Sequence, residues 1–272
     1  MPGSAAETVP EIEPYAGFRY RERRFRFDAD EEARLLGLCG LDPAIYGGGV
    51  DPAYFITHGI NEGVLNGISV NGGVNMVQKL LVHRLLRLDE EVTVDGEVLE
   101  VRQAPRGRIS TSEVRYRGED GTLAVVSRRM SLKTDPTKQA DPALRGAGER
   151  PPPVIEDPAK LRQIGSATLT PEAVKAYSLH TNNPIHTEMD SANRAGYRAP
   201  IIGGAHGTRY LTAAIWRAFR PTGADLDVYF RRPLFWDDSF DIRVREAGDR
   251  WSALCAAKGP KVAVEMKVNA LT

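Results

Sequence analysis

The stretch that decides the fold is residues 170–207, TPEAVKAYSLHTNNPIHTEMDSANRAGYRAPIIGGAHG. Thr170 is a good helix N-cap and the proline that follows it suits the first helical position, so a short helix is predicted through Tyr177. Pro184 disfavours helical backbone at the preceding residue, Asn183. The chain is therefore expected to leave the helix and form a loop before it reaches the next helical segment.

Two histidines lie in this predicted loop, His180 and His186. A second short helix is expected at 189–195, and Gly203-Gly204 then opens a long apolar helix. The N-terminus of a helix presents unpaired backbone N–H groups, which can stabilise a developing oxyanion. A histidine can act as a base near neutral pH. The loop and the helix start together are a candidate active site.

Downstream of the long helix the pattern changes to antiparallel strands. Residues 261–268 alternate well, with Val262, Val264 and Met266 on one face and charged residues on the other. Further strands are expected at 226–235, 240–244 and 251–257. The second half of the chain thus reads as one helix with an antiparallel sheet.

The first half shows a similar order. Gly72-Gly73-Val74 precedes an apolar run through Leu80, Leu81 and Leu85, which we read as the matching helix. Strands are predicted at 92–101, 110–116 and 123–132, with a turn at 118–121, and the alternating arginines 19, 21 and 23 indicate a solvated strand face. These matches favour a duplicated unit.

A segment rich in proline, glycine and charge separates the halves. Residues 134–158 read TDPTKQADPALRGAGERPPPVIEDP and hold no hydrophobic period. The expected organisation is an N-terminal half at 1–133, a linker at 134–158 and a C-terminal half at 159–272. Each half is expected to be of the α+β class, an antiparallel sheet wrapped around a long central helix.

Composition narrows the partners. The chain has 36 basic and 36 acidic residues, so it has no excess positive charge that would favour binding of nucleic acid. The two cysteines, Cys39 and Cys255, are fewer than a secreted disulfide scaffold would carry. The start of the sequence lacks the features of a signal peptide and no segment is apolar for the length of a membrane helix. We expect a cytoplasmic protein with no membrane partner.

The loop resembles the signature of the MaoC-like, (R)-specific enoyl-thioester hydratases. That signature reads approximately Tyr … Gly-Asp-x-Asn-Pro-(aliphatic)-His-x5-Ala, and Tyr177, Asn183-Pro184-Ile185-His186 and Ala192 match it. The stretches Gly196-Tyr197 and Pro200-Ile201 resemble the segment that the family carries before its central helix. The resemblance implies a tandem, or double, hot-dog fold, with the first half as the degenerate partner domain.

The resemblance also implies roles. In the family an Asp and the motif His activate a water that adds to C3 of a trans-2-enoyl thioester, and a backbone N–H at the start of the central helix binds the thioester oxygen. By position, His186 would be the motif histidine, Gly204 would supply the oxyanion N–H and Asn183 would shape the loop. The substrate would be an acyl thioester of coenzyme A or a carrier protein. No cofactor and no metal are expected, and a homodimer is the expected assembly.

The sequence departs from the family at the catalytic acid. The family's Gly-Asp is His180-Thr181 here, and a threonine cannot serve as a carboxylate base. Its His-Gly at the oxyanion position is replaced by Gly203-Gly204. Three readings stay open: His180 pairs with His186, a carboxylate such as Glu188 or Glu62 replaces the Asp, or hydration is lost.

A polar tract in the first half, residues 57–67, has the sequence THGINEGVLNG. Its glycines and asparagines favour a turn-rich loop. His58, Glu62 and the more distant Asn71 are possible substrate-pocket residues. The first functional hypothesis is a hydratase or dehydratase-like lyase. The alternatives are a hot-dog enzyme of different chemistry, such as a tailoring enzyme or thioesterase, and a non-catalytic acyl-binding subunit.

Overall fold

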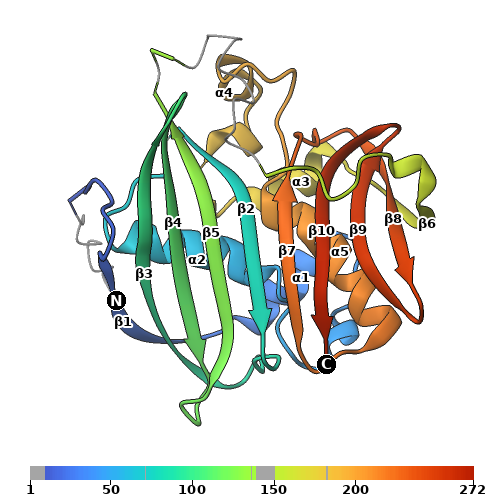
Figure 1. The fold of residues 1–272 in the computed structure, drawn as a ribbon, viewed down its shortest axis with the longest axis horizontal. Helices are drawn as coiled ribbons and strands as arrows, with labels where there is room; N and C mark the ends of the chain where they lie inside the picture. Colours follow the sequence, from blue (N-terminus) through green and yellow to red (C-terminus); the bar gives the residue numbers. More distant parts are fainter. Residues whose placement is uncertain (1–9, 71, 136, 139–150, 182) are drawn as a thin grey trace.

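The computed structural model describes residues 10–70, 72–135, 137–138, 151–181 and 183–272. Within these ranges ten strands form one antiparallel sheet in the order β1-β3-β4-β5-β2-β7-β10-β9-β8-β6 (Figure 1). The strands are β1 Arg19–Arg26, β2 Gly73–Val82, β3 Glu91–Ala104, β4 Gly107–Arg117, β5 Leu123–Thr134, β6 Arg162–Thr168, β7 Ala224–Phe230, β8 Ser239–Ala247, β9 Arg250–Lys258 and β10 Lys261–Leu271. The strands expected in both halves are confirmed, although β7 ends five residues before position 235.

The helices are α1 Ala29–Leu38, α2 Tyr54–Leu65, α3 Pro171–Ser178, α4 Met189–Arg194 and α5 Gly204–Phe219. Short 3-10 turns are η1 Pro43–Tyr46, η3 Pro158–Lys160 and η4 Pro184–His186. Helix α2 packs on β4 and β5, while α5 packs on β9 and β10. Each half is therefore a helix held by an antiparallel sheet, as expected (Figure 1). No helix in the described ranges combines the length and apolarity needed to cross a membrane.

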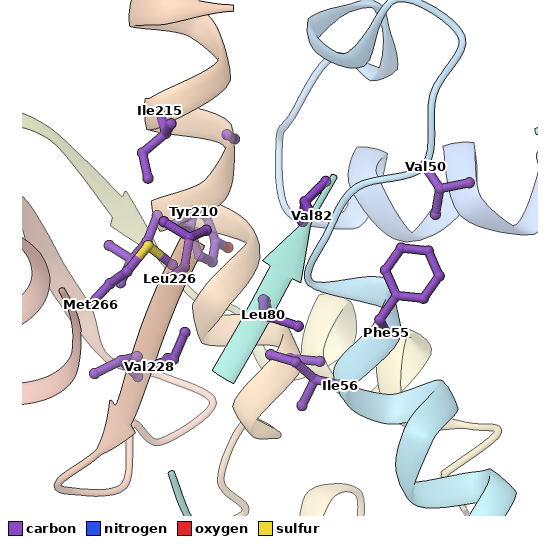
Figure 2. Packing of buried hydrophobic residues seen from close by; sticks show 14 of the residues in the cluster. Val50, Phe55, Ile56, Leu80, Val82, Tyr210, Ile215, Leu226, Val228 and Met266 are labelled. Carbon is purple, nitrogen blue, oxygen red and sulfur yellow. The ribbon is translucent and has the colours of Figure 1, made fainter. Parts of the chain in front are cut away.

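The two halves join at a seam between β2 and β7. These strands pair antiparallel from Val77 opposite Tyr229 to Val82 opposite Ala224. Figure 2 shows the packing beside the seam, where Leu80 of β2 lies near the α2 residue Ile56, and Val228 of β7 belongs to the same buried cluster. One hydrophobic cluster thus extends through both halves. The division at 134–158 stays a prediction, and residues 139–150 of that segment lie outside the described residues.

The prediction of a helix after Gly72-Gly73 is wrong. The run through Leu80 and Leu81 is strand β2, in which Met76, Gln78, Leu80 and Val82 are buried in alternation. That period of two is the pattern of a strand. Strand β2 lies between β5 and β7 and is therefore a central strand of the sheet. It carries leucines on both of its faces, so its sequence has the continuous apolar character that is also typical of a buried helix.

The central helix of the first half is instead α2, which contains most of the tract that we read as a turn-rich loop. Glycines lower helix propensity, and two of them, Gly59 and Gly63, lie in α2. A Cβ at Gly59 would lie 3.4 Å from the Ser127 Oγ, and one at Gly63 would lie 3.4 Å from the Tyr20 hydroxyl. Both distances are ordinary van der Waals contacts, so a methyl group would fit at either position. The packing of α2 on β4 and β5 therefore outweighs the low helix propensity of the two glycines.

Candidate active site

The loop is built by local capping. The Thr170 hydroxyl accepts a hydrogen bond from the Ala173 N–H at 3.2 Å, which starts α3 where the sequence predicted. After α3 ends, Thr181 donates its N–H (3.0 Å) and its hydroxyl (2.8 Å) to the carbonyl of Ser178. The Asn183 side chain accepts from the Ile185 N–H at 3.4 Å and starts the turn η4. Asn183 thus shapes the loop, and the Thr181 hydroxyl is engaged with the end of α3.

His186 is oriented by the strand-like segment that precedes α5. Its Nδ1 lies 2.7 Å from the carbonyl oxygen of Ile201, and the Ile201 N–H donates to Ile185 at 3.2 Å. Because a carbonyl only accepts, Nδ1 carries the proton and Nε2 keeps its lone pair. Burial lowers the pKa of His186, and the hydrogen bond to Ile201 opposes this. The ring is therefore a neutral imidazole with Nε2 available as a base.

The imidazole lies against the N-terminus of α5. Gly203 is the N-cap and, as a glycine, has no side chain that could cap the first N–H groups of the helix. A Cβ placed on Gly203 would be 4.0 Å from His186 Cε1. A Cβ on Gly204 would be 2.7 Å from Phe230 Cε1, so the backbone at Gly204 is packed where only glycine fits. The candidate base thus lies beside the N-terminus of α5.

Sequence reasoning missed a third histidine, His206, in the first turn of α5. Its side chain is completely buried and neither ring nitrogen has a hydrogen-bond partner in the described structure. The ring stacks on Tyr177 at 4.0 Å between centroids and on Tyr210 at 6.0 Å. Burial lowers its pKa to about 3, and the positive charge of Arg209 lowers it further. The sequence offers only a weak sign of it, a histidine one turn into a glycine-opened helix.

A buried ion cluster holds α3 and α5 together behind the loop. Arg209 of α5 donates to Glu32 of α1 at 2.7 and 2.8 Å and to Asp51 at 2.9 Å. Its Nε donates to the Tyr177 hydroxyl at 2.8 Å, and Thr212 donates to Asp51 at 2.8 Å. Burial raises the pKa of Glu32 while Arg209 opposes that shift. Because a buried charge without its partner is costly, this cluster fixes α3, and hence the loop, relative to α5.

Neither His180 nor Glu188, both proposed to replace the missing Asp, forms a hydrogen bond or ion pair with His186 in the described structure. His180 is 76% exposed and its Nε2 lies 3.9 Å from a Glu31 oxygen of α1. Glu188 is exposed and accepts a hydrogen bond from Ser191 at 2.8 Å. Among the described residues, no carboxylate forms a hydrogen bond or ion pair with His186.

The structure places His58 and Glu62 together on α2, facing β1 and β4. Glu62 pairs with Arg23, and His58 Nδ1 lies 3.2 Å from the Tyr116 hydroxyl. The His58 ring stacks on Phe25 at 4.4 Å, and burial lowers its pKa to about 3. Asn71 lies outside the described residues. The described His, Cys, Asp and Glu side chains form no group of three that could hold a metal ion.

Solved structures share this architecture. HtdX from Mycobacterium tuberculosis is 18% identical with a TM-score of 0.70 and covers 92% of this chain and 98% of its own. A MaoC-like dehydratase from Phytophthora capsici is 13% identical with a TM-score of 0.69, over 95% and 97% of the two chains. The peroxisomal multifunctional enzyme type 2 of Drosophila melanogaster is 18% identical with a TM-score of 0.65, over 92% of this chain and 48% of that one.

Two further structures have a TM-score of 0.58 at 13% identity: a Mycobacterium tuberculosis protein described as a double hot-dog and a putative oleoyl thioesterase from Lactobacillus plantarum. The sequence matches no protein-family model and no curated protein sequence. At these identities the likeness concerns the fold. The expected resemblance is thereby confirmed at that level: the chain has the double hot-dog fold of the MaoC-like dehydratases.

Proposed function

We propose that this protein is a hydratase or dehydratase acting on an enoyl or 3-hydroxyacyl thioester, with His186 as its base. The observation that carries the proposal is the geometry of His186. The Ile201 carbonyl fixes the proton on Nδ1, which leaves Nε2 free beside the uncapped start of α5. The double hot-dog fold shared with the MaoC-like dehydratase supports it.

In the hydration direction, Nε2 of His186 removes a proton from a water as the water oxygen bonds to C3 of the substrate. The electrons of the C2–C3 double bond move toward the thioester, whose oxygen gains negative charge. The N–H of Gly204 and its neighbours at the helix start would stabilise that charge. The proton held by His186 then passes to C2, which completes addition of water.

The missing carboxylate is compatible with slower turnover. A neutral His186 already has its tautomer set by a backbone carbonyl, which is one task of the Asp in an acid–base dyad. General acid–base help by one group is worth about 10²–10⁴-fold, so a single base retains part of the rate. His206, whose ring nitrogens have no hydrogen-bond partner in the described structure, is a second neutral imidazole near His186.

The test is the loss of ultraviolet absorbance of trans-2-enoyl-CoA substrates of increasing chain length. The native protein is expected to consume the conjugated thioester, and His186→Ala should abolish this. His180→Ala is the matched control, because that histidine is exposed and lies away from His186. If His186→Ala keeps native turnover, the assigned base is wrong. Sedimentation of the same sample tests the proposed homodimer.

Thioester hydrolysis is the second candidate, and two observations favour it. The family's Asp position is held by Thr181, and a putative oleoyl thioesterase shares the fold with a TM-score of 0.58. Release of free coenzyme A thiol, measured in the same reactions with saturated acyl-CoA, separates the two. Thiol release that His186→Ala removes, without hydration of any enoyl-CoA, would favour the thioesterase.

A further inference from the structure

A cavity of about 740 Å³ lies on the outer face of α5, away from the His186 loop. Its walls are the inner face of β6, the end of α1 with the turn after it, and the second half of α5. Strand β6 is an edge strand that pairs with β8 alone in the described sheet (Figure 1), so the cavity opens at the margin of the fold. Pockets that hold small molecules have volumes of about 300–1,000 Å³.

Part of the cavity wall is buried and apolar. Cys39, Leu41, Leu169 and Tyr210 form it and are all buried. Burial raises the pKa of Cys39 to about 12, so this thiol stays neutral and behaves as an apolar wall. An aliphatic group against this wall would lose its contact with water without leaving a charge unpaired.

The floor of the cavity is a trough along α5. Tyr210, Ala214 and Ala218 lie four residues apart and therefore share one face of the helix. The two alanines leave room above the backbone, whereas Ile242 and Trp251 form the opposite wall. A trough that follows a helix for two turns suits an unbranched chain better than a compact ring system.

The mouth carries one positive charge. Arg217 is the one charged side chain among the described residues that line the cavity, and it forms no ion pair or hydrogen bond within them. It is exposed, next to the exposed Ala218. A guanidinium is always charged and binds a carboxylate through two parallel hydrogen bonds.

We propose that this cavity binds a linear amphiphile, a fatty carboxylate, with its aliphatic chain toward Tyr210 and its carboxylate at Arg217. The site is separate from the candidate active site, because none of residues 180–204 lines the cavity. Tyr210 of the cavity wall stacks on His206 of α5, with 6.0 Å between the ring centroids. The proposal goes beyond the proposed function and survives if hydration fails.

Tryptophan fluorescence offers a direct test with decanoate as the probe. Trp251 lines the cavity and packs edge-on against Phe219 at 4.8 Å, so a bound chain changes its surroundings. We expect a saturable change in fluorescence that Trp251→Phe removes, and binding in calorimetry that Trp251→Phe retains. His186→Ala should bind decanoate as the native protein does.

Three variants and one control decide the assignment. Arg217→Gln is expected to weaken decanoate binding about tenfold, whereas Arg19→Gln, an exposed arginine of β1, should not change it. Ala214→Phe fills the trough and should abolish binding, and Ala218→Phe at the exposed mouth repeats the test if Ala214→Phe is unstable. Decanol, which lacks the carboxylate, should bind the native protein as weakly as decanoate binds Arg217→Gln.

The result that overturns the proposal is the absence of saturable decanoate binding, or binding that neither alanine variant weakens. Equal affinity of Arg217→Gln and Arg19→Gln for decanoate would overturn the placement of the carboxylate. Hydration measured on the same variants is a separate readout. Loss of enoyl-CoA turnover in His186→Ala with native decanoate binding supports two independent sites.

Discussion

Replacing Gly204 by alanine is expected to disrupt the start of α5, whereas the same change at Gly203 is expected to be tolerated. The added methyl group at 204 would lie 2.7 Å from Cε1 and 2.8 Å from Cζ of Phe230. At Gly203 it would lie 4.0 Å from His186 Cε1, and φ there is −70°, which suits alanine. Two adjacent glycines therefore provide a test and its own control.

The size of the effect follows from the contact. Carbon atoms pack at about 3.5–4.0 Å, so the Phe230 ring or the helix start must move by about 0.8 Å. Overpacking of this kind costs about 1–3 kcal/mol, which for a chain of this length lowers Tm by about 2–12 °C. Gly203→Ala should cost about 1 kcal/mol, because the site is spared the clash and loses only the preference of an N-cap for glycine over alanine. If Gly204 supplies the oxyanion N–H, its displacement should also lower kcat by about 10²–10³-fold.

Thermal unfolding of a double-mutant cycle measures the contact without reference to any activity. In a Phe230→Leu background the ring is gone, so Gly204→Ala should cost at least about 1 kcal/mol less than in the native background. Gly203→Ala should cost the same in both backgrounds. Equal losses for the two glycines, with no coupling to Phe230, would refute the packing argument.

Other predictions follow from burial and charge. The pKa of His206 is about 3 in the folded protein, against 6.5 for an unperturbed histidine. Between these two pH values the unfolded chain binds a proton that the folded chain does not, so the free energy of unfolding decreases as pH falls from 6.5 toward 3. His206→Leu should flatten the fall in Tm between pH 7 and 5, and His83→Leu, at an exposed site, should not; equal slopes would contradict the assignment. Arg209→Met leaves two buried carboxylates unpaired, so the free energy of unfolding measured in urea should fall by about 3–5 kcal/mol. A fall of less than about 1 kcal/mol would be evidence against a stabilising role of the cluster. Gly59→Ala should stabilise by about 0.5–1 kcal/mol if that residue is helical, and a loop there predicts no gain.

The helices and the loop of the second half can be predicted from the sequence because the features that determine them are local. The Thr170 cap, the proline at 184 and the glycine pair before α5 each act within a few residues. The first half was misread where packing outweighs local preference. Gly59 and Gly63 look like loop residues until the sheet they touch is known.

The candidate site divides in the same way. His186 and Asn183 were found from one continuous motif. His206 and the Arg209 cluster were not, because their environment depends on distant segments: Arg209 meets Glu32 and Asp51 across 177 and 158 residues of sequence. No local sequence pattern predicts that His206 stacks on both Tyr177 and Tyr210.

The β2–β7 seam has a consequence for how the chain folds. Val82 pairs with Ala224, so the contact closes a loop of 142 residues, from 224 − 82. Closing such a loop costs more entropy than the hairpins β3–β4 or β9–β10, whose strands follow one another directly. Non-local strand pairing is slow, so each half should collapse first and the ladder between them should form late. Until then β2 and β7 are the edge strands of their separate halves, each with one side that is not hydrogen-bonded to a neighbouring strand. The chain is most prone to aggregation during that interval.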